Sequence, residues 1–236
     1  MKETRLEEDA SIYVKRRKFT EKEKWQALSS KDKVQYFSDY YLKYCIFGVA
    51  LIGIVVYFLY SILTPKPKSV LNIAFINSNL SQEKSSFLEK ELGHALDIDP
   101  EKECVSVDTS LYIDTENPSQ ASMASEQKLS IYTFNGDYDL VIADSSTFKR
   151  YAEGGYFEHL TESLPSNLYN DFTDRFLMAK AADQDTEEMP YGISLRGYKN
   201  FENLDSCIVD PVLGILASSK NTAKGIDVLD WMVEKQ

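Results

Sequence analysis

One long apolar segment divides the chain into two parts with different patterns of hydrophobic and polar residues. Between Lys43 and Lys66 lie 22 residues without a charge. As a helix they extend about 33 Å, more than the roughly 30 Å of a bilayer's hydrocarbon core. The buried helices of soluble proteins rarely run this far without a polar face. We therefore predict a transmembrane helix over residues 45–64, with the lipid bilayer as its partner.

After this segment, short apolar runs alternate with helical patterns. Strand-like runs begin at Val70, Cys104 and Tyr138, and apolar residues at helical spacing follow each of them. Residues 191–195 and 212–217 predict two more strands, with short helices and a polar loop over 161–189 and a last helix after Asn221. Repeated strand–helix alternation is typical of parallel strands with helices on both faces. We predict one α/β domain over residues 65–236, built on a mostly parallel sheet.

Residues 1–44 have the character of a cytoplasmic tail. They carry 11 Lys and Arg, including the run Lys15-Arg16-Arg17-Lys18, against 8 Asp and Glu. An excess of basic residues favours the cytoplasmic side. A cleaved signal peptide has a much shorter leader, so we predict an uncleaved, single-pass signal anchor. Ser29 and Ser30 suit the cap of a juxtamembrane helix that runs from Lys31 into the membrane span.

The net charge of −11 divides unevenly at the membrane. The tail has a charge of +3, the anchor has none, and residues 65–236 hold 15 Lys and Arg against 29 Asp and Glu, a charge of −14. An acidic domain on the extracytoplasmic side is a poor partner for nucleic acid, so we expect no nucleic-acid binding.

The candidate binding chemistry follows the predicted strands. Ligands of open α/β sheets bind beyond the carboxyl ends of the strands, where this sequence places short polar segments. Backbone N–H groups at the start of the helix after the third strand suggest an anion site, to which a nearby arginine adds a cation. Ordinary caps and turns explain the same residue types. The predicted ligand-binding residues are Asn77, Ser78, Asp108, Thr109, Asp144, Ser145, Ser146 and Arg196.

Catalytic, metal and cofactor chemistry is poorly represented. The segments after Asp108 and Asp144 lack the third oxygen of an Asp-x-Ser-x-Ser metal loop, since Tyr112 and Phe148 stand in its place. No Gly-x-Ser-x-Gly or Gly-rich phosphate loop occurs, and His94 and His159 read as surface or packing residues. We predict no catalytic residues, no metal, no cofactor and no enzyme activity.

The cysteines leave two alternatives open. Cys104 and Cys207 both belong to the extracytoplasmic domain, where oxidation is permitted, and they flank different predicted strands. A disulfide needs close and correctly oriented partners, so we weigh a bond between them against two free thiols. Cys45 lies at the membrane entrance and reads as an unpaired apolar residue.

Three segments resemble bacterial extracellular solute-binding proteins of the type II periplasmic-binding-protein class. The segments are residues 71–76, residues 136–160 with the strand Tyr138-Asp139-Leu140-Val141, and residues 212–233. The resemblance implies one lobe of such a protein, because only about 50 residues separate Leu160 from Val212. The anchored arrangement is also similar to membrane proteins of Gram-positive bacteria.

Two functions remain open on this sequence. The first is a membrane-tethered, extracytoplasmic, solute-binding-like module that binds a small ligand or docks on a transporter or another membrane complex. The second is a non-catalytic scaffold or assembly protein with a degenerate binding-protein fold. A pocket at the strand ends favours the first, and a flat surface with an apolar patch favours the second.

Overall fold

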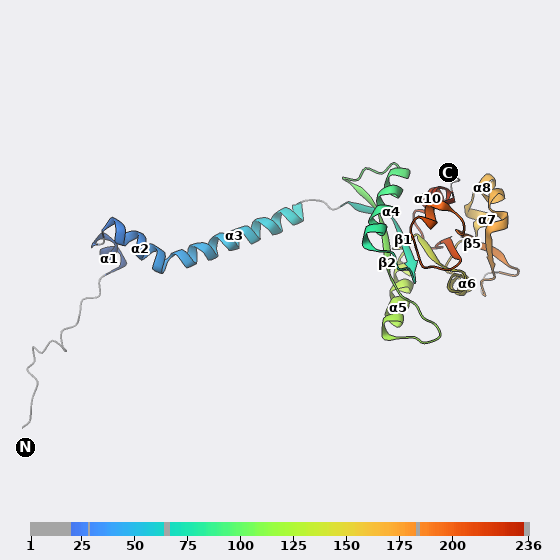
Figure 1. The fold of residues 1–236 in the computed structure, drawn as a ribbon, viewed down its shortest axis with the longest axis horizontal. Coiled ribbons are helices and arrows are strands. Elements are labelled where there is room, and N and C mark those ends of the chain that lie inside the picture. The colour runs from blue at the N-terminus through green and yellow to red at the C-terminus, as the bar shows by residue number, and fades with distance from the viewer. Residues whose placement is uncertain (1–19, 28, 64–66, 183–184, 234–236) are drawn as a thin grey trace, which may run out of the picture. The chain divides into compact units, whose positions relative to one another are not determined.

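The computed structural model describes residues 20–27, 29–63, 67–182 and 185–233. The chain divides into two compact units, residues 1–65 and residues 66–236. Figure 1 labels helices and strands of both units. The basic run at residues 15–18 lies outside the described residues.

The first unit consists of helices. The Ser29 hydroxyl accepts the N–H of Asp32 and caps α2, as predicted, but α2 ends before Tyr41 and does not continue unbroken into the apolar helix α3. α3 has 22 residues and no buried residue, and an 18-residue stretch of it has a mean hydropathy of 2.5, so it is long and apolar enough to cross a membrane. The helices are α1 (Glu21–Ala27), α2 (Ser30–Tyr40) and α3 (Leu42–Leu63).

The second unit holds one six-stranded sheet with helices on its faces (Figure 1). The order of the strands across the sheet is β2-β1-β3-β6-β5-β4. The strands are β1 (Lys68–Ile76), β2 (Glu103–Leu111), β3 (Leu140–Asp144), β4 (Phe176–Ala179), β5 (Met189–Ser194) and β6 (Pro211–Ile215). The helices are α4 (Gln82–Ala95), α5 (Gln120–Asn135), α6 (Ser145–Glu153), α7 (Leu160–Ser163), α8 (Ser166–Asp171), the 3-10 turn η1 (Thr173–Arg175), α9 (Lys199–Glu202) and α10 (Thr222–Val233).

The sheet changes direction halfway across. β1 pairs in parallel with β2 and β3, whereas β6 runs antiparallel to β3 and β5, and β4 runs antiparallel to β5. Four strands therefore point one way, but the pairing is more antiparallel than the alternation predicts. Helical crossovers connect β1, β2 and β3, while β4 and β5 form a hairpin, and short connections favour antiparallel pairs.

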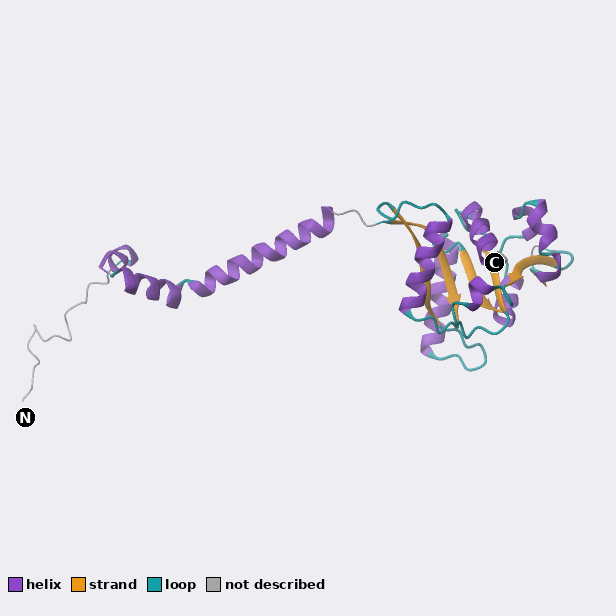
Figure 2. Ribbon diagram, turned by 45° about the horizontal axis from the view of Figure 1, so that its top comes forward, coloured by secondary structure: helices purple, strands orange, loops and turns teal. Residues whose placement is uncertain are grey.

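Both faces of the sheet are buried, as predicted for helices on either side. Along β1, Leu71, Ile73 and Phe75 face one cluster with α4, α9 and α10, and Ala74 and Ile76 face the other with α5 and α6. Successive side chains of a strand point to opposite faces, so an apolar run is what a strand covered on both sides requires. Figure 2 shows the sheet between its helices.

The segment between Leu160 and Val212 forms no second lobe in its described part. It supplies β4 and β5 to the same sheet, and α7, α8 and α9 pack on that sheet's face. β4 was not predicted, because four apolar residues within a polar region show too little periodicity to identify a strand. The domain is therefore a single α/β layer structure.

Local side chains decide where the helices begin. The hydroxyl of Ser81 caps α4 by accepting the N–H of Lys84. α5 begins at Gln120, because the Ser119 hydroxyl accepts the N–H of Ser122. Serine is a strong N-cap residue, and it sets the start of the helix here.

Two glycines fix the position of α6 against the sheet. A Cβ on Gly192 of β5 or on Gly214 of β6 would overlap the ring of Phe148, which enters from α6. That ring stacks on Phe157 with 4.1 Å between the centroids. The missing side chains therefore let α6 approach the sheet closely and hold its first turn at the strand ends.

Cys104 and Cys207 do not form a disulfide. The Sγ of Cys104 contacts the carbonyl of Pro67, while the Sγ of Cys207 contacts the carbonyl of Asn77. These carbonyls lie at opposite ends of the nine-residue strand β1, roughly 30 Å apart. All three cysteines are free.

Candidate functional site

A groove of two adjoining hollows follows the carboxyl ends of β1, β3 and β5. The first hollow has a volume of about 390 Å³ and the second about 590 Å³, and they share Ser145, Ser146 and Asp210. β6 and β4 run the other way, so their amino ends reach the same edge. We call these two hollows the strand-end groove. Its lining also includes Asn77, Asp144, Lys149, Arg175, Phe176, Leu177, Met178, Ser194, Arg196, Cys207, Ile208, Val209 and Val212.

Five of the eight predicted residues meet in this groove. Ser145 and Ser146 lie in its middle, Asn77 and Asp144 line the first hollow, and Arg196 lines the second. The Asn77 side chain is already occupied, because its amide donates to the carbonyl of Ile113 and accepts the N–H of that residue, each at 2.8 Å. Asn77 thus shapes the groove more than it presents polar atoms to it.

The other three predicted residues do not line the groove. The Oγ of Ser78 is buried and has no hydrogen-bond partner among the described residues. Thr109 is half-buried in β2, away from the groove lining. Asp108 faces α5, where its carboxylate accepts hydrogen bonds from Lys128, Tyr138 and Ser110.

The start of α6 is closed to an anion. The carboxylate of Asp144 accepts the N–H groups of Ser146 and Thr147, the donors that the sequence offered to a ligand. Burial acts to raise the pKa of Asp144, but hydrogen bonds from Ser146 and Thr147 outweigh it and lower that pKa. The predicted anion site at this helix start is therefore wrong, because the chain's own carboxylate fills it.

Sequence reasoning missed three charged residues of the groove. Lys149 lies one helical turn after Ser145 in α6, so the predicted helix could have placed it on the same face as Ser145. Arg175 comes directly before β4, so it was missed along with that strand. Asp210 precedes β6, and its Oδ1 lies 2.9 Å from Nη1 of Arg196.

The aspartate in the segment that resembles binding proteins has a structural role. Asp139 is 1% exposed, and its carboxylate accepts hydrogen bonds from the N–H of Asn72 at 2.9 Å, the hydroxyl of Ser219 at 2.7 Å and the amide of Asn221 at 3.1 Å. It joins β1 to the turn between β6 and α10. This contact lies at the amino end of β3, and the groove lies at the carboxyl end of the same strand.

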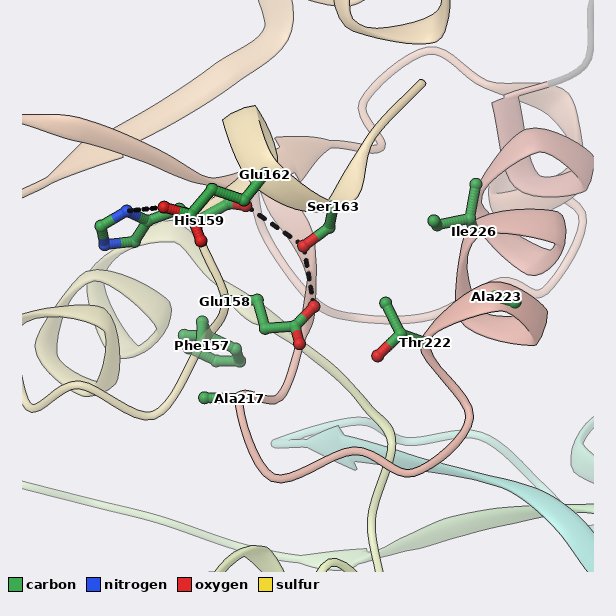
Figure 3. A pocket seen from close by; sticks show the side chains of 9 residues that line it. All are labelled: Phe157, Glu158, His159, Glu162, Ser163, Ala217, Thr222, Ala223 and Ile226. Carbon is green, nitrogen blue, oxygen red and sulfur yellow. Dashed lines mark hydrogen bonds and ion pairs between the residues drawn. The ribbon is translucent and has the colours of Figure 1, made fainter. Parts of the chain in front are cut away.

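A separate hollow of about 720 Å³ lies where β6 meets the start of α10 (Figure 3). The Ser163 hydroxyl donates to the carboxylate of Glu158 at 2.7 Å and lies 3.2 Å from the carbonyl of His159. This hydroxyl contacts a backbone oxygen of His159 and not its imidazole, so the hollow shows no serine paired with a histidine base.

The imidazole of His159 belongs to a polar cluster behind that hollow. Its Nε2 lies 2.7 Å from the hydroxyl of Tyr191 and 3.1 Å from the carboxylate of Asp185, whose side chain is 2% exposed. Hydrogen bonds from Tyr191, together with those from the Ala181 N–H and His159, lower the pKa of Asp185. The cluster ties the loop after β4 to the sheet, which agrees with the prediction of a packing role for this histidine.

The comparisons with known proteins return a structural likeness without a close relative. No protein-family model matches the chain, and no curated protein does. The solved structures that resemble it are extracellular solute-binding proteins. One is the ABC substrate-binding protein from Listeria monocytogenes in complex with cycloalternan, with 18% identity over 54% of this chain and a TM-score of 0.29. Another is an extracellular solute-binding protein of family 1 from Alicyclobacillus acidocaldarius, with 16% identity over 55% of this chain and a TM-score of 0.31.

The matched regions cover 29% and 28% of those two proteins. The chain therefore spans less than a third of the length of either. Both are extracellular solute-binding proteins, the class that the three sequence segments resemble.

Proposed function

We propose that this chain is a membrane-tethered, extracytoplasmic binding module that takes a small ligand in the strand-end groove. The observation that carries the proposal is the convergence of polar residues from three strand ends. Asn77 follows β1, Asp144 ends β3 and Arg196 follows β5, yet all three line one groove. The carboxyl edge of an open α/β sheet is where such folds bind ligands.

The open form of the groove sets the expected mode of binding. The described residues of the domain form a single sheet, and none of them forms a second lobe that closes over a ligand. A ligand held on one side buries less surface than one enclosed in a cleft, which limits its affinity. A transporter or another membrane complex is then the natural partner to cover the exposed side.

The proposed location rests on α3 and on the charges around it. α3 is long and apolar enough to cross a bilayer. The tail before it is basic and the domain after it is strongly acidic. We infer that the tail is cytoplasmic and that the α/β domain is extracytoplasmic, anchored by one pass.

A groove-filling substitution tests the binding proposal. In Ser145→Trp a large ring enters the middle of the groove at the first residue of α6. Gln120→Trp is the matched control, because Gln120 is the exposed first residue of α5 and does not line the groove. Thermal unfolding of the full chain with sugars, peptides and anions should show compounds that stabilise the native chain and the control but not Ser145→Trp. A panel without a stabilising compound, or one that stabilises all three chains equally, contradicts the proposal.

One surface favours the alternative, a non-catalytic scaffold. The outward face of α5 carries Met123, Ile131 and Phe134, and Phe134 is 89% exposed. Exposed apolar residues grouped on one helix face are typical of surfaces that contact another protein. A photocrosslinking residue at position 134 should capture one defined partner in native membranes if the scaffold function holds, while the same residue at exposed Glu101 captures none. Equal capture at both positions argues against it.

A further inference from the structure

The second hollow of the strand-end groove is cationic although the domain is acidic. Lys149 of α6, Arg175 of η1 and Arg196 after β5 line it, and among the described residues of that lining only Asp210 is acidic. The domain as a whole has a charge of −14. Three cations against one carboxylate therefore make the lining of this hollow cationic.

The two arginines each contact other groups of the domain. Nη1 of Arg175 donates to the carbonyl of Arg196 at 2.7 Å, and the guanidinium lies over the ring of Tyr198, 5.1 Å from its centroid. Nη1 of Arg196 donates to the carboxylate of Asp210 at 2.9 Å. These contacts use one nitrogen of each guanidinium. Each group has five N–H donors in a planar fork that fits carboxylate and phosphate oxygens, so donors remain for a ligand.

Lys149 of α6 completes the set of cations. Its exposed ammonium has no ion-pair partner among the described residues, and it lies one turn along α6 from Ser145. The other end of the groove is unsuited to an anion, because Asp144 places its carboxylate at the start of α6. The groove is therefore asymmetric, with its capacity for negative charge near β4 and β5.

We propose that the ligand of the strand-end groove is an oxyanion, a small molecule bearing a carboxylate or a phosphate. Arg175 and Arg196 bind its oxygens with charge-assisted hydrogen bonds, and Lys149 adds a third positive charge. The inference rests on the proposed binding function and names the class of ligand for that same groove.

The test measures binding to the full chain in phosphatidylcholine nanodiscs by equilibrium dialysis. Inorganic phosphate and citrate serve as the two probes, one for each source of oxyanion. Arg175→Gln and Arg196→Gln should each weaken binding of at least one probe roughly tenfold, since each removes a charged hydrogen-bonding fork. Affinity should also fall as salt rises from about 50 to about 300 mM.

Lys102→Gln is the matched control. It removes one positive charge from an exposed position before β2, at the opposite edge of the sheet from the groove. Binding in this variant should equal that of the native chain. Equal weakening by Lys102→Gln overturns the proposal, because it shows attraction to overall charge only. Arg175→Lys guards against misfolding, because it keeps the charge but loses the fork and should bind between Arg175→Gln and the native chain.

Two further outcomes separate this inference from the function on which it rests. If neither probe binds but an uncharged sugar or peptide does, and Ser145→Trp abolishes that binding while Arg175→Gln and Arg196→Gln leave it unchanged, the groove is functional and the oxyanion class is wrong. If no probe and no uncharged compound binds, both the inference and the proposed function are rejected.

Discussion

Replacement of Asp108 by Asn should weaken the domain in a manner that depends on pH. The carboxylate accepts hydrogen bonds from Nζ of Lys128 at 2.6 Å, from the hydroxyl of Tyr138, and from the N–H and hydroxyl of Ser110 at 2.9 and 2.7 Å. Burial acts to raise the pKa of Asp108, but these hydrogen bonds outweigh it and lower that pKa from 3.8 to about 2. The bonds join β2, α5 and the start of the β3 segment.

The size of the effect follows from the difference in pKa. Nearly two pH units at about 1.36 kcal/mol each give roughly 2 kcal/mol of stability. Because the pKa is lowered by folding, this contribution is fully present above the unfolded value near 3.8, and it is lost as the pH falls through about 2. The difference in unfolding free energy between the native chain and Asp108→Asn should therefore shrink by about 2 kcal/mol between pH 5 and pH 2.

The assay is urea unfolding of the full chain in nanodiscs, followed by the fluorescence of Trp231 in a Trp25→Phe background. Asp171→Asn is the control, because Asp171 is exposed and has no side-chain hydrogen bond among those of the described residues. The difference in unfolding free energy between the native chain and Asp171→Asn should not change over the same pH range. The reasoning is refuted if the difference in unfolding free energy between the native chain and Asp108→Asn stays constant between pH 5 and pH 2. It is also refuted if the difference for Asp171→Asn shrinks by the same amount.

Three further predictions concern stability and topology. Asp139→Ala should lower the free energy of unfolding by about 3 kcal/mol, because it leaves three partly buried donors without their acceptor; a loss below about 1 kcal/mol by urea titration contradicts this. Gly214→Ala should cost about 2 kcal/mol, since its Cβ overlaps the ring of Phe148, whereas Gly93→Ala, with open space around it, should cost nothing. In a chain whose other two cysteines are Ser, an impermeant maleimide should label Cys207 in intact cells. A cysteine introduced by Lys31→Cys should react only after permeabilisation, and the reverse pattern contradicts the topology.

The sequence pattern predicts the fold wherever burial is continuous. Val141 and its neighbours in β3 and the run after Val212 are apolar on both faces, so they read as central strands. β4 is the exception, because it is short, lies at the edge of the sheet and has Met178 partly exposed. Its direction, and that of β6, depend on tertiary pairing that no local pattern encodes.

The candidate site is predictable only as far as the rule for strand ends extends. That rule identifies Asn77, Asp144, Ser145 and Ser146, because their positions follow from where strands stop. It fails for Asp108, because β2 continues to Leu111 and Asp108 therefore lies within the strand, where its carboxylate pairs with Lys128 of α5. The sequence also does not show that the carboxylate of Asp144 caps α6, because a polar residue before a helix can bind either the helix or a ligand.

A fluorescent reporter on Cys207 tests the central claim, ligand binding in the strand-end groove, most directly. Cys207 is exposed and lines the first hollow, so a fluorophore on its thiol senses an occupant of the groove. With the other two cysteines replaced by Ser, the full chain is titrated with sugars, peptides and oxyanions, beside a control chain that carries the fluorophore at Glu101→Cys. The account predicts a saturable change in emission for at least one compound at Cys207 and none at position 101. No change for any compound, or equal changes at both positions, would contradict it.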